Sequence, residues 1–296
     1  MQQIDLESTR KLLSWLPILV LPLAALACRN LVPPWVFMWI LSFTIFFSIK
    51  LLVWSRARSH IRTPLSRSLG FLFAWPGMDA DGFLDAKERV AVPRFSAWFW
   101  AVAKTASGAI LLWAGARSIP PRLALLRGWT GMIGLILILH FGSFQLVALI
   151  WQSRGIKADP IMSAPLRSNS LAEFWGKRWN LGFRQLAHEL IFRPLYRVLG
   201  ADGAGFLVFA VSGLVHDLVI SVPARGGYGL PTLYFLLQGV GVRTERSQVG
   251  SRLGLARGIR GWCFMALFLT APLFWLFHPW FVARVILPFM QAVHAI

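Results

Sequence analysis

The sequence predicts an all-α, polytopic membrane protein, built as a bundle of about eight transmembrane helices with amphipathic helices at the membrane interface. Of its 296 residues, 56% are hydrophobic and 14% are charged, and the mean hydropathy is +0.61. Soluble domains contain roughly 45–50% apolar and about 25% charged residues. The uncharged runs are also long, and several reach the roughly 20 residues that a helix needs to cross a bilayer.

Eight apolar runs have the length or near-length of a span. They are residues 12–28, 32–54, 95–116, 123–151, 203–222, 229–242, 261–277 and 280–295. Seven to nine spans fit the same pattern, because the fourth run is overlong and the sixth is short. Residues 68–84 are apolar as well, but Pro76–Gly77 indicates a turn and we expect this stretch at the interface. No internal repeat or low-complexity segment divides the chain, so we expect residues 1–296 to form a single membrane-embedded domain.

Basic residues alternate between the predicted loops in a way that indicates an orientation. The loops at about 55–94, 153–201 and 243–260, together with Arg10 and Lys11, hold 22 basic residues, and the other loops hold four. The positive-inside rule places these basic loops and both termini in the cytoplasm. The net charge of +18 therefore follows from topology and does not predict nucleic-acid binding. The basic residues are 24 Arg and 6 Lys, a bias typical of a GC-rich bacterial genome, so we expect the membrane to be a bacterial inner membrane.

Residues 171–198, in the longest predicted cytoplasmic loop, have the pattern of an amphipathic helix lying in the membrane surface. The apolar face comprises Leu171, Trp175, Trp179, Phe183, Leu186 and Leu190, and the opposite face comprises Glu173, Lys177, Arg184 and His188. Asn180 falls at the boundary between these faces. Gly176 and Gly182 weaken the helix, so we expect it to dip into the bundle or to break at Gly182.

A second polar group lies inside a predicted span, in AVSGLVHDLVISV, residues 210–222. An ionisable side chain in a span costs about 2.5–3.5 kcal/mol on insertion scales, so His216 and Asp217 are functional candidates. A desolvated imidazole stays neutral and can act as a general base; the structural alternative is a histidine bonded to a neighbouring helix. Ser212, one turn before His216, is expected to pack or to bond its own helix. His140, in the fourth apolar run, is a further candidate for the pocket.

Other motifs that carry chemistry are missing from the sequence. Cys28 and Cys263 form no CxxC pair, so neither a metal site nor a disulfide framework is indicated. Residues 188–192 read HELIF instead of HExxH, and there is no phosphate-binding loop or dinucleotide fingerprint. A GxSxG elbow is also missing. We therefore expect no metal and no permanently bound cofactor, and a base that acts directly on a substrate hydroxyl.

FWGKRWN, residues 174–180, is followed 36 residues after its asparagine by a histidine inside a predicted span. With this pair the sequence resembles the membrane-bound O-acyltransferase (MBOAT) superfamily, and more narrowly its wax-synthase-like branch. The similar stretch runs from about Pro160 to Val222 and contains PLRSNSLAEFWGKRWN and VSGLVHDL. The resemblance implies acyl transfer from acyl-CoA, as co-substrate, to the hydroxyl of a lipid-like alcohol.

The resemblance also implies roles for individual residues. His216 takes the proton of the acceptor hydroxyl, and Asn180 stabilises the oxyanion or orients a substrate. The implied substrate-binding set is Phe174, Trp175 and Trp179 for the acyl chain, Lys177, Arg178 and Arg184 for the phosphates of coenzyme A, and Ser212, Asp217 and His140 around the pocket. The cations fit positive-inside topology and anionic lipid binding equally well, and the tryptophans also fit an interfacial aromatic belt. Lys177 and Arg178 replace an acid found in the sterol and glyceride branches, which leaves the acceptor open.

Two other functions fit the same residues. Acetyl or acyl transfer to a sugar or a secondary-metabolite hydroxyl would use the same base. A proton-coupled transporter or a lipid-binding membrane protein would use His216 and Asp217 as a proton relay. The transporter alternative predicts paired broken spans in two related halves, and the sequence has no such symmetry. The expected partners are membrane lipids, acyl-CoA and a small lipid-like alcohol, with no nucleic acid and no signal for an oligomeric state.

Overall fold

Every regular element that the structure describes is helical, as the composition predicts. The computed structural model describes the backbone of residues 2–88 and 90–296 and the side chains of residues 15–88 and 90–296. Arg10, Lys11 and Arg89, which count toward the predicted orientation, lie outside the residues whose side chains are described.

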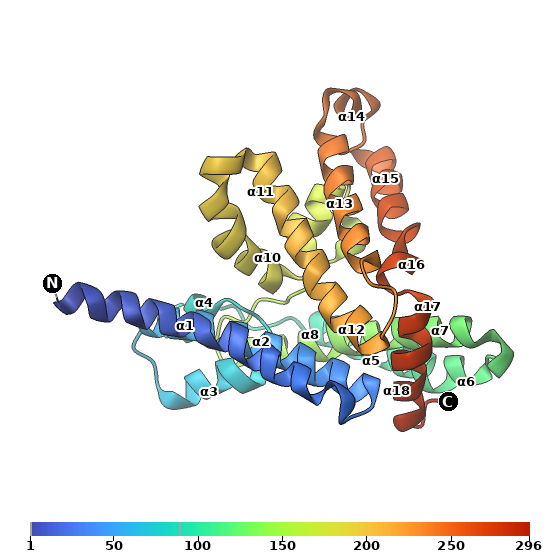
Figure 1. Cartoon of the computed structure of the whole chain (residues 1–296), viewed down its shortest axis with the longest axis horizontal. Coiled ribbons are helices and arrows are strands. Elements are labelled where there is room, and N and C mark those ends of the chain that lie inside the picture. Colours follow the sequence, from blue (N-terminus) through green and yellow to red (C-terminus); the bar gives the residue numbers. More distant parts are fainter. Residues whose placement is uncertain (1, 89) are drawn as a thin grey trace.

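The first half of the chain forms two helical hairpins (Figure 1). The first hairpin pairs α1 (Gln2–Ala27) with α2 (Pro34–Arg58) through the turn η1 (Cys28–Asn30). The second runs through α5 (Phe95–Ala109), η2 (Ile110–Gly115) and α6 (Ala116–Ser118), and returns through η3 (Pro121–Leu123), α7 (Ala124–Ile136), η4 (Leu137–Ser143) and α8 (Phe144–Ser153). Between the hairpins lie α3 (Leu65–Ala74) and α4 (Ala80–Leu84), separated by the predicted turn at Pro76–Gly77.

The second half contributes a broken segment and a set of longer helices. The broken segment comprises η5 (Pro165–Arg167), α9 (Leu171–Glu173), η6 (Phe174–Arg178), α10 (Leu181–Ala187) and η7 (His188–Phe192). It continues into α11 (Arg193–His216), η8 (Asp217–Ser221) and α12 (Val222–Ala224). The remaining elements are α13 (Leu230–Arg246), α14 (Gln248–Leu253), α15 (Gly258–Thr270), α16 (Leu273–Leu276), α17 (Pro279–Phe281), η9 (Val282–Ile286) and α18 (Leu287–Ala292).

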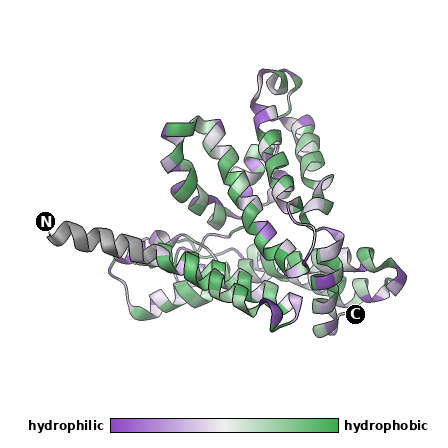
Figure 2. Cartoon of the chain, viewed as in Figure 1, coloured by the Kyte–Doolittle hydropathy of each residue, from purple (hydrophilic) through white to green (hydrophobic). Residues whose placement is uncertain are grey.

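Five of the eight predicted spans form helices that are long and apolar enough to cross a membrane. Within the described residues these are Pro34–Arg58, Phe95–Ser118, Pro121–Ser153, Leu181–Ala224 and Gly258–Leu276. The run at 12–28 lies in α1, of which only the part from Trp15 enters this comparison, and the runs at 229–242 and 280–295 form shorter or interrupted helices. The crossing of these three runs stays a prediction. Large apolar side chains point outward, as lipid contact requires; Leu19, Trp100 and Leu267 are 64%, 61% and 60% exposed. Figure 2 shows this apolar cover on the helices and polar residues at tips such as α14.

The 44-residue helical run Leu181–Ala224 is longer than a bilayer needs, and it is folded back on itself at Gly200. Gly200 has φ 67°, a conformation that costs a residue with a Cβ extra energy. Because of this turn η7, which precedes it in the chain, packs against α11, as the curled ribbon in Figure 1 shows. The segment predicted as one surface helix, 171–198, thus ends just before this fold-back, and within it η6 ends at Arg178 and α10 begins at Leu181.

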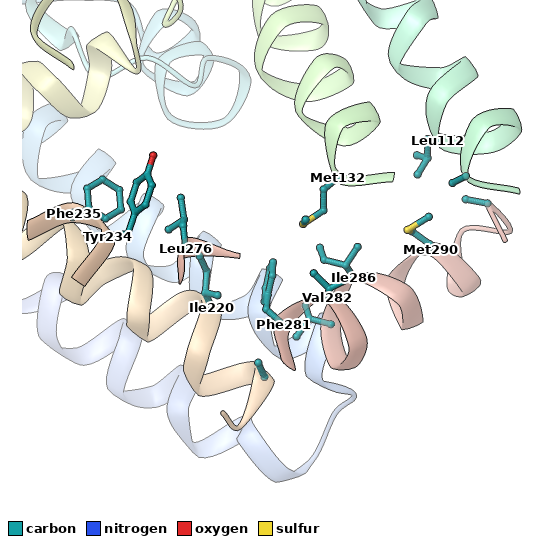
Figure 3. Close-up of a cluster of buried hydrophobic side chains, with 14 residues drawn as sticks. Leu112, Met132, Ile220, Tyr234, Phe235, Leu276, Phe281, Val282, Ile286 and Met290 are labelled. Carbon is teal, nitrogen blue, oxygen red and sulfur yellow. The ribbon is translucent and has the colours of Figure 1, made fainter. Parts of the chain in front are cut away.

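The largest buried cluster joins the C-terminal helices to α7 and α13 (Figure 3). Val282 and Met290 are fully buried against α7, next to Met132. On the other side Tyr234 and Phe235 of α13 complete the cluster with Ile220 of η8 and Leu276 of α16. Burying a large apolar side chain contributes about 1.5–3 kcal/mol, so this cluster fixes the position of α13. That helix in turn packs along α11, which carries His216.

Candidate active site

One cavity of about 890 Å³ lies between α2, α3, η4, α10, α11 and α13. Most of the predicted site residues line it: His140, Trp175, Trp179, Asn180, Arg184, Ser212 and His216. The others are Phe174, Lys177, Arg178 and Asp217, and they do not line it. The structure thus brings the tryptophan-rich motif and the histidine of α11 to one chamber, although 36 residues separate Asn180 from His216.

The broken segment changes direction at Asn180. The π-helical turn η6 ends at Arg178, Trp179 is extended, and Asn180 adopts a left-handed conformation with φ 42°. Its side-chain Oδ1 accepts a hydrogen bond from Phe183 N at 3.2 Å and so caps the start of α10. The predicted break is thus present, but its predicted place is wrong: Gly182 is buried inside α10, and the break precedes it at Trp179–Asn180. Asparagine tolerates a positive φ better than most residues, which explains why the break falls there.

The front of the motif is held by a buried carboxylate from another helix. Glu245, near the end of α13, is 2% exposed and accepts hydrogen bonds from the backbone amides of Leu171 and Ala172, each at 2.8 Å. These amides are unsatisfied donors at the start of α9. Burial raises the pKa of the Glu245 carboxyl, while the two amides and Arg246 oppose that rise.

A capping box and an ion pair complete this anchor. Ser170 Oγ accepts from Glu173 N at 3.0 Å, and Glu173 accepts from Asn169 N at 2.8 Å. Arg178 then donates to Glu173 at 2.8 Å. The bond from Asn169 and the pairing with Arg178 hold the pKa of Glu173 below its usual value. Arg178 is therefore engaged within its own segment and faces away from the cavity lining.

The rear of the motif is pinned to the segment before it. Ser163 N donates to Arg178 O at 2.8 Å, and Leu181 N donates to Ile161 O at 2.9 Å. Asn180 N, between them, lies 3.4 Å from Met162 Sδ. The break is thus flanked by backbone hydrogen bonds on both sides, which fixes the direction in which the Asn180 side chain leaves the chain.

His216 is oriented by its own helix. Its Nδ1 lies 2.7 Å from the carbonyl oxygen of Ser212. A carbonyl can only accept, so Nδ1 carries the proton and Nε2 is the basic nitrogen. The Ser212 hydroxyl donates to Val208 O at 2.9 Å, which makes Ser212 a back-bonding residue, as expected.

Phe235 links the motif to the histidine. Its ring centroid lies 4.4 Å from that of His216 and 5.6 Å from that of Trp175. This contact is possible because α11 and α13 approach closely at Gly213, where a Cβ would lie 2.7 Å from the Cα of Thr232. Trp175 Nε1 and His140 Nδ1 are buried beside the cavity and have no hydrogen-bond partner among the described residues.

Asp217, next to His216 in the sequence, has a structural environment. Its carboxylate accepts from Ser221 Oγ at 2.7 Å, from Gly229 N at 2.9 Å and from both the amide and the hydroxyl of Thr232. Gly229 and Thr232 belong to the first turn of α13, so Asp217 acts as a cap supplied by a neighbouring helix. Ser221 also contacts the buried His278 at 3.3 Å. The carboxylate is therefore directed away from the cavity and holds α13 to α11.

Lys177 is exposed, and Phe174 is buried in a small cluster with Leu171 and Met265. The cavity has other polar residues that the sequence pattern does not single out, namely His188 of η7 and Arg246 at the end of α13. Arg246 is one of five arginines predicted to lie in a cytoplasmic loop, and only the fold distinguishes it from the rest. Glu245 could have been noticed in the sequence, because it is the sole acidic residue between residues 243 and 260.

Residues 158–237 match the sequence profile described as the membrane bound O-acyl transferase family. The resemblance to the MBOAT superfamily is confirmed. The matching segment contains the broken motif, the Asn180 turn and the α11 histidine.

Curated relatives of this chain support the resemblance to the wax-synthase-like branch. A probable long-chain-alcohol O-fatty-acyltransferase of Arabidopsis thaliana is 31% identical over 140 residues, which cover 42% of this chain and 40% of that protein. A long-chain-alcohol O-fatty-acyltransferase of Simmondsia chinensis is 30% identical over 120 residues, 36% of this chain and 34% of that protein. An acyl-CoA–sterol O-acyltransferase of Arabidopsis thaliana is 32% identical over 77 residues, 24% and 22% of the two chains.

The aligned part of the chain therefore spans 40% or less of the length of these relatives. Each relative is named as an acyltransferase, which favours the enzyme class over the transporter alternative. The apolar helices and the matching family profile indicate a multi-pass membrane protein.

Proposed function

We propose that this chain is an integral-membrane O-acyltransferase that transfers an acyl group from acyl-CoA to the hydroxyl of a long-chain alcohol. The observation that carries the proposal is His216, whose tautomer is set by the Ser212 carbonyl and whose ring lines the same cavity as Asn180. The names of the relatives support the substrate class. We further propose that the chain acts as one domain in a bacterial inner membrane, with both termini in the cytoplasm.

In the proposed reaction His216 Nε2 takes the proton of the alcohol as its oxygen attacks the thioester carbonyl. The C–O bond forms and the carbonyl oxygen becomes an oxyanion. This intermediate collapses, the C–S bond breaks, and the leaving thiolate takes the proton from the imidazolium. The products are an ester and free coenzyme A, and the base is regenerated without any oxidant or reductant.

Asn180 has the geometry of an oxyanion donor in this reaction. Its Oδ1 is occupied by Phe183 N–H, an assignment that also fixes the orientation of the amide because an N–H needs an oxygen acceptor. Both Nδ2 hydrogens then remain to donate to a group in the cavity. Removing one such donor from an acyl-transfer site costs about 10²–10³ in kcat.

Different parts of the cavity lining suit different parts of the substrates. Arg184 and Arg246 are its cationic residues and suit the phosphates of coenzyme A. Lys177 and Arg178, which the sequence pattern suggests for the same role, do not line the cavity, so we assign the phosphate contact to Arg184 and Arg246. Along α2 and α3 the lining is apolar and suits alkyl chains.

The proposal is tested with the purified chain in lipid nanodiscs. Labelled acyl-CoA is supplied with a long-chain primary alcohol, a sterol or a sugar, and the ester product is measured. We expect ester from the long-chain alcohol, and a loss of about 10²–10⁴ in turnover for His216→Ala.

The matched control is His60→Ala, since the His60 side chain is 58% exposed and contacts only Ser59 and the exposed Asp81 of α4 among the described residues. Surface changes of this kind shift free energies by about 0.5 kcal/mol, roughly twofold in rate. Full turnover by His216→Ala would contradict the base assignment. A wild-type protein that makes no ester with any alcohol contradicts the activity itself.

A further inference from the structure

Lys50 is a fully buried lysine inside the span α2. Its Nζ donates to the carbonyl oxygen of Gly77 at 2.5 Å and lies 3.4 Å from the ring centroid of Phe71. No carboxylate pairs with it among the described side chains. A lysine in a span costs about 2.5–3.5 kcal/mol on insertion scales, and a simple packing role does not require an amino group there.

The group that Lys50 holds is the turn between α3 and α4. Pro76–Gly77 leaves its carbonyls outside any helix, and the Lys50 amino group satisfies the one on Gly77. Trp75, Pro76 and Met78, the residues around that carbonyl, all line the cavity. Lys50 itself does not line the cavity, so it affects the cavity only through these lining residues.

This turn reaches the break that carries Asn180. Met78 packs against Gly182, where a Cβ would lie 3.4 Å from the Met78 amide and 3.5 Å from its Cγ. Gly182 lies in the first turn of α10, two residues after Asn180. On its other side the turn borders the apolar lining from α2, including Phe46 and Ile49.

We propose that Lys50 is a specificity-determining positioning residue: by holding the Gly77 carbonyl it fixes the turn 75–78 as the end wall of the apolar part of the cavity, and so sets the length of alkyl chain that fits. This inference rests on the proposed acyltransferase function. Both the acyl donor and the alcohol carry an alkyl chain, and either chain could occupy this part of the cavity. Separate series of donors and of alcohols show which of the two chains the wall limits.

Lys50→Met tests the wall, because methionine fills a similar volume without an amino group. The control is Lys104→Met, since Lys104 is a half-buried lysine of the span α5 that lies 5.9 Å from the ring of Phe141 and does not line the cavity. We measure kcat/KM for acyl-CoA donors of 12 to 20 carbons with one alcohol, and for alcohols of the same lengths with one donor (about 0.8 kcal/mol, roughly fourfold, per buried methylene).

The expected result is that Lys50→Met flattens the length preference of one series by about tenfold or more, while Lys104→Met keeps the wild-type profile. Met78→Ala, which opens the same wall without touching the lysine, is expected to change the same series. An equal loss at every chain length in Lys50→Met, or an unchanged profile in both Lys50→Met and Met78→Ala, overturns the inference and leaves the acyltransferase activity standing.

Hydrogen exchange of residues 75–84 tests the tether without turnover. Loss of the hydrogen bond from Lys50 to Gly77 predicts exchange about tenfold faster in Lys50→Met, with no change in Lys104→Met. Unchanged exchange overturns the inference even if no ester forms, and a wild-type protein that forms no ester overturns the proposed function instead.

Discussion

Replacing Glu245 gives a prediction whose magnitude follows from the structure. The carboxylate is 2% exposed and accepts from the amides of Leu171 and Ala172, both at 2.8 Å. Glu245→Ala leaves both donors buried without a partner, and each unsatisfied donor costs about 1–3 kcal/mol. The expected loss is therefore about 2–6 kcal/mol for Glu245→Ala and about half of that for Glu245→Gln, which keeps one acceptor oxygen.

The assay is thermal unfolding in detergent, followed by the fluorescence of the 15 tryptophans. At about 2 °C per kcal/mol for a chain of this size, Glu245→Ala lowers Tm by roughly 4–12 °C. The control Glu189→Ala removes an exposed acid bonded only to Gln185, and is expected to shift Tm by about 1 °C. Equal Tm values for wild type and Glu245→Ala would refute the view that this carboxylate anchors the motif.

Three further predictions concern the same segment. Asn180→Gly keeps the positive φ and costs only a few tenths of a kcal/mol as a cap, so it should retain the wild-type Tm but lose about 10²–10³ in kcat; an unchanged kcat contradicts the oxyanion role. Arg246→Gln should raise KM for acyl-CoA, whereas Lys177→Gln, which changes an exposed residue, should leave that KM unchanged. Initial rates measured across acyl-CoA concentrations give the KM of each variant, and equal KM values for both would contradict the phosphate role of Arg246. The lowered pKa of Glu173 means that its contribution to stability is present above the ordinary Glu pKa and is lost as pH falls through the lowered value; Tm measured from pH 7 to pH 3 should show this loss in wild type and less of it in Glu173→Gln.

The sequence predicted the helical class because apolar run length depends only on the bilayer, and five of its runs became long apolar helices. Of the three aromatic residues suggested for the acyl chain, Trp175 and Trp179 line the cavity with His216, whereas Phe174 does not. The sequence did not locate the fold-back at Gly200, which lies between the predicted surface helix 171–198 and the predicted span 203–222. The role of Asp217 could not be predicted from the sequence either. Its partners include the backbone amides of Gly229 and Thr232 at the start of α13, and backbone groups leave no pattern in the sequence.

The polar groups buried around the cavity share one physical cause. A chamber of about 890 Å³ in a helical bundle needs helices that start, stop or bend at its walls, and each such point leaves backbone groups without helical partners. At three of these points an ionisable side chain satisfies a backbone group: Glu245 at the start of α9, Asp217 at the start of α13, and Lys50 at the turn after α3. His216 is different, because its bond to the Ser212 carbonyl engages only Nδ1 and leaves Nε2 for a substrate. This difference separates the proposed base from the three ionisable residues that bond to the backbone around it.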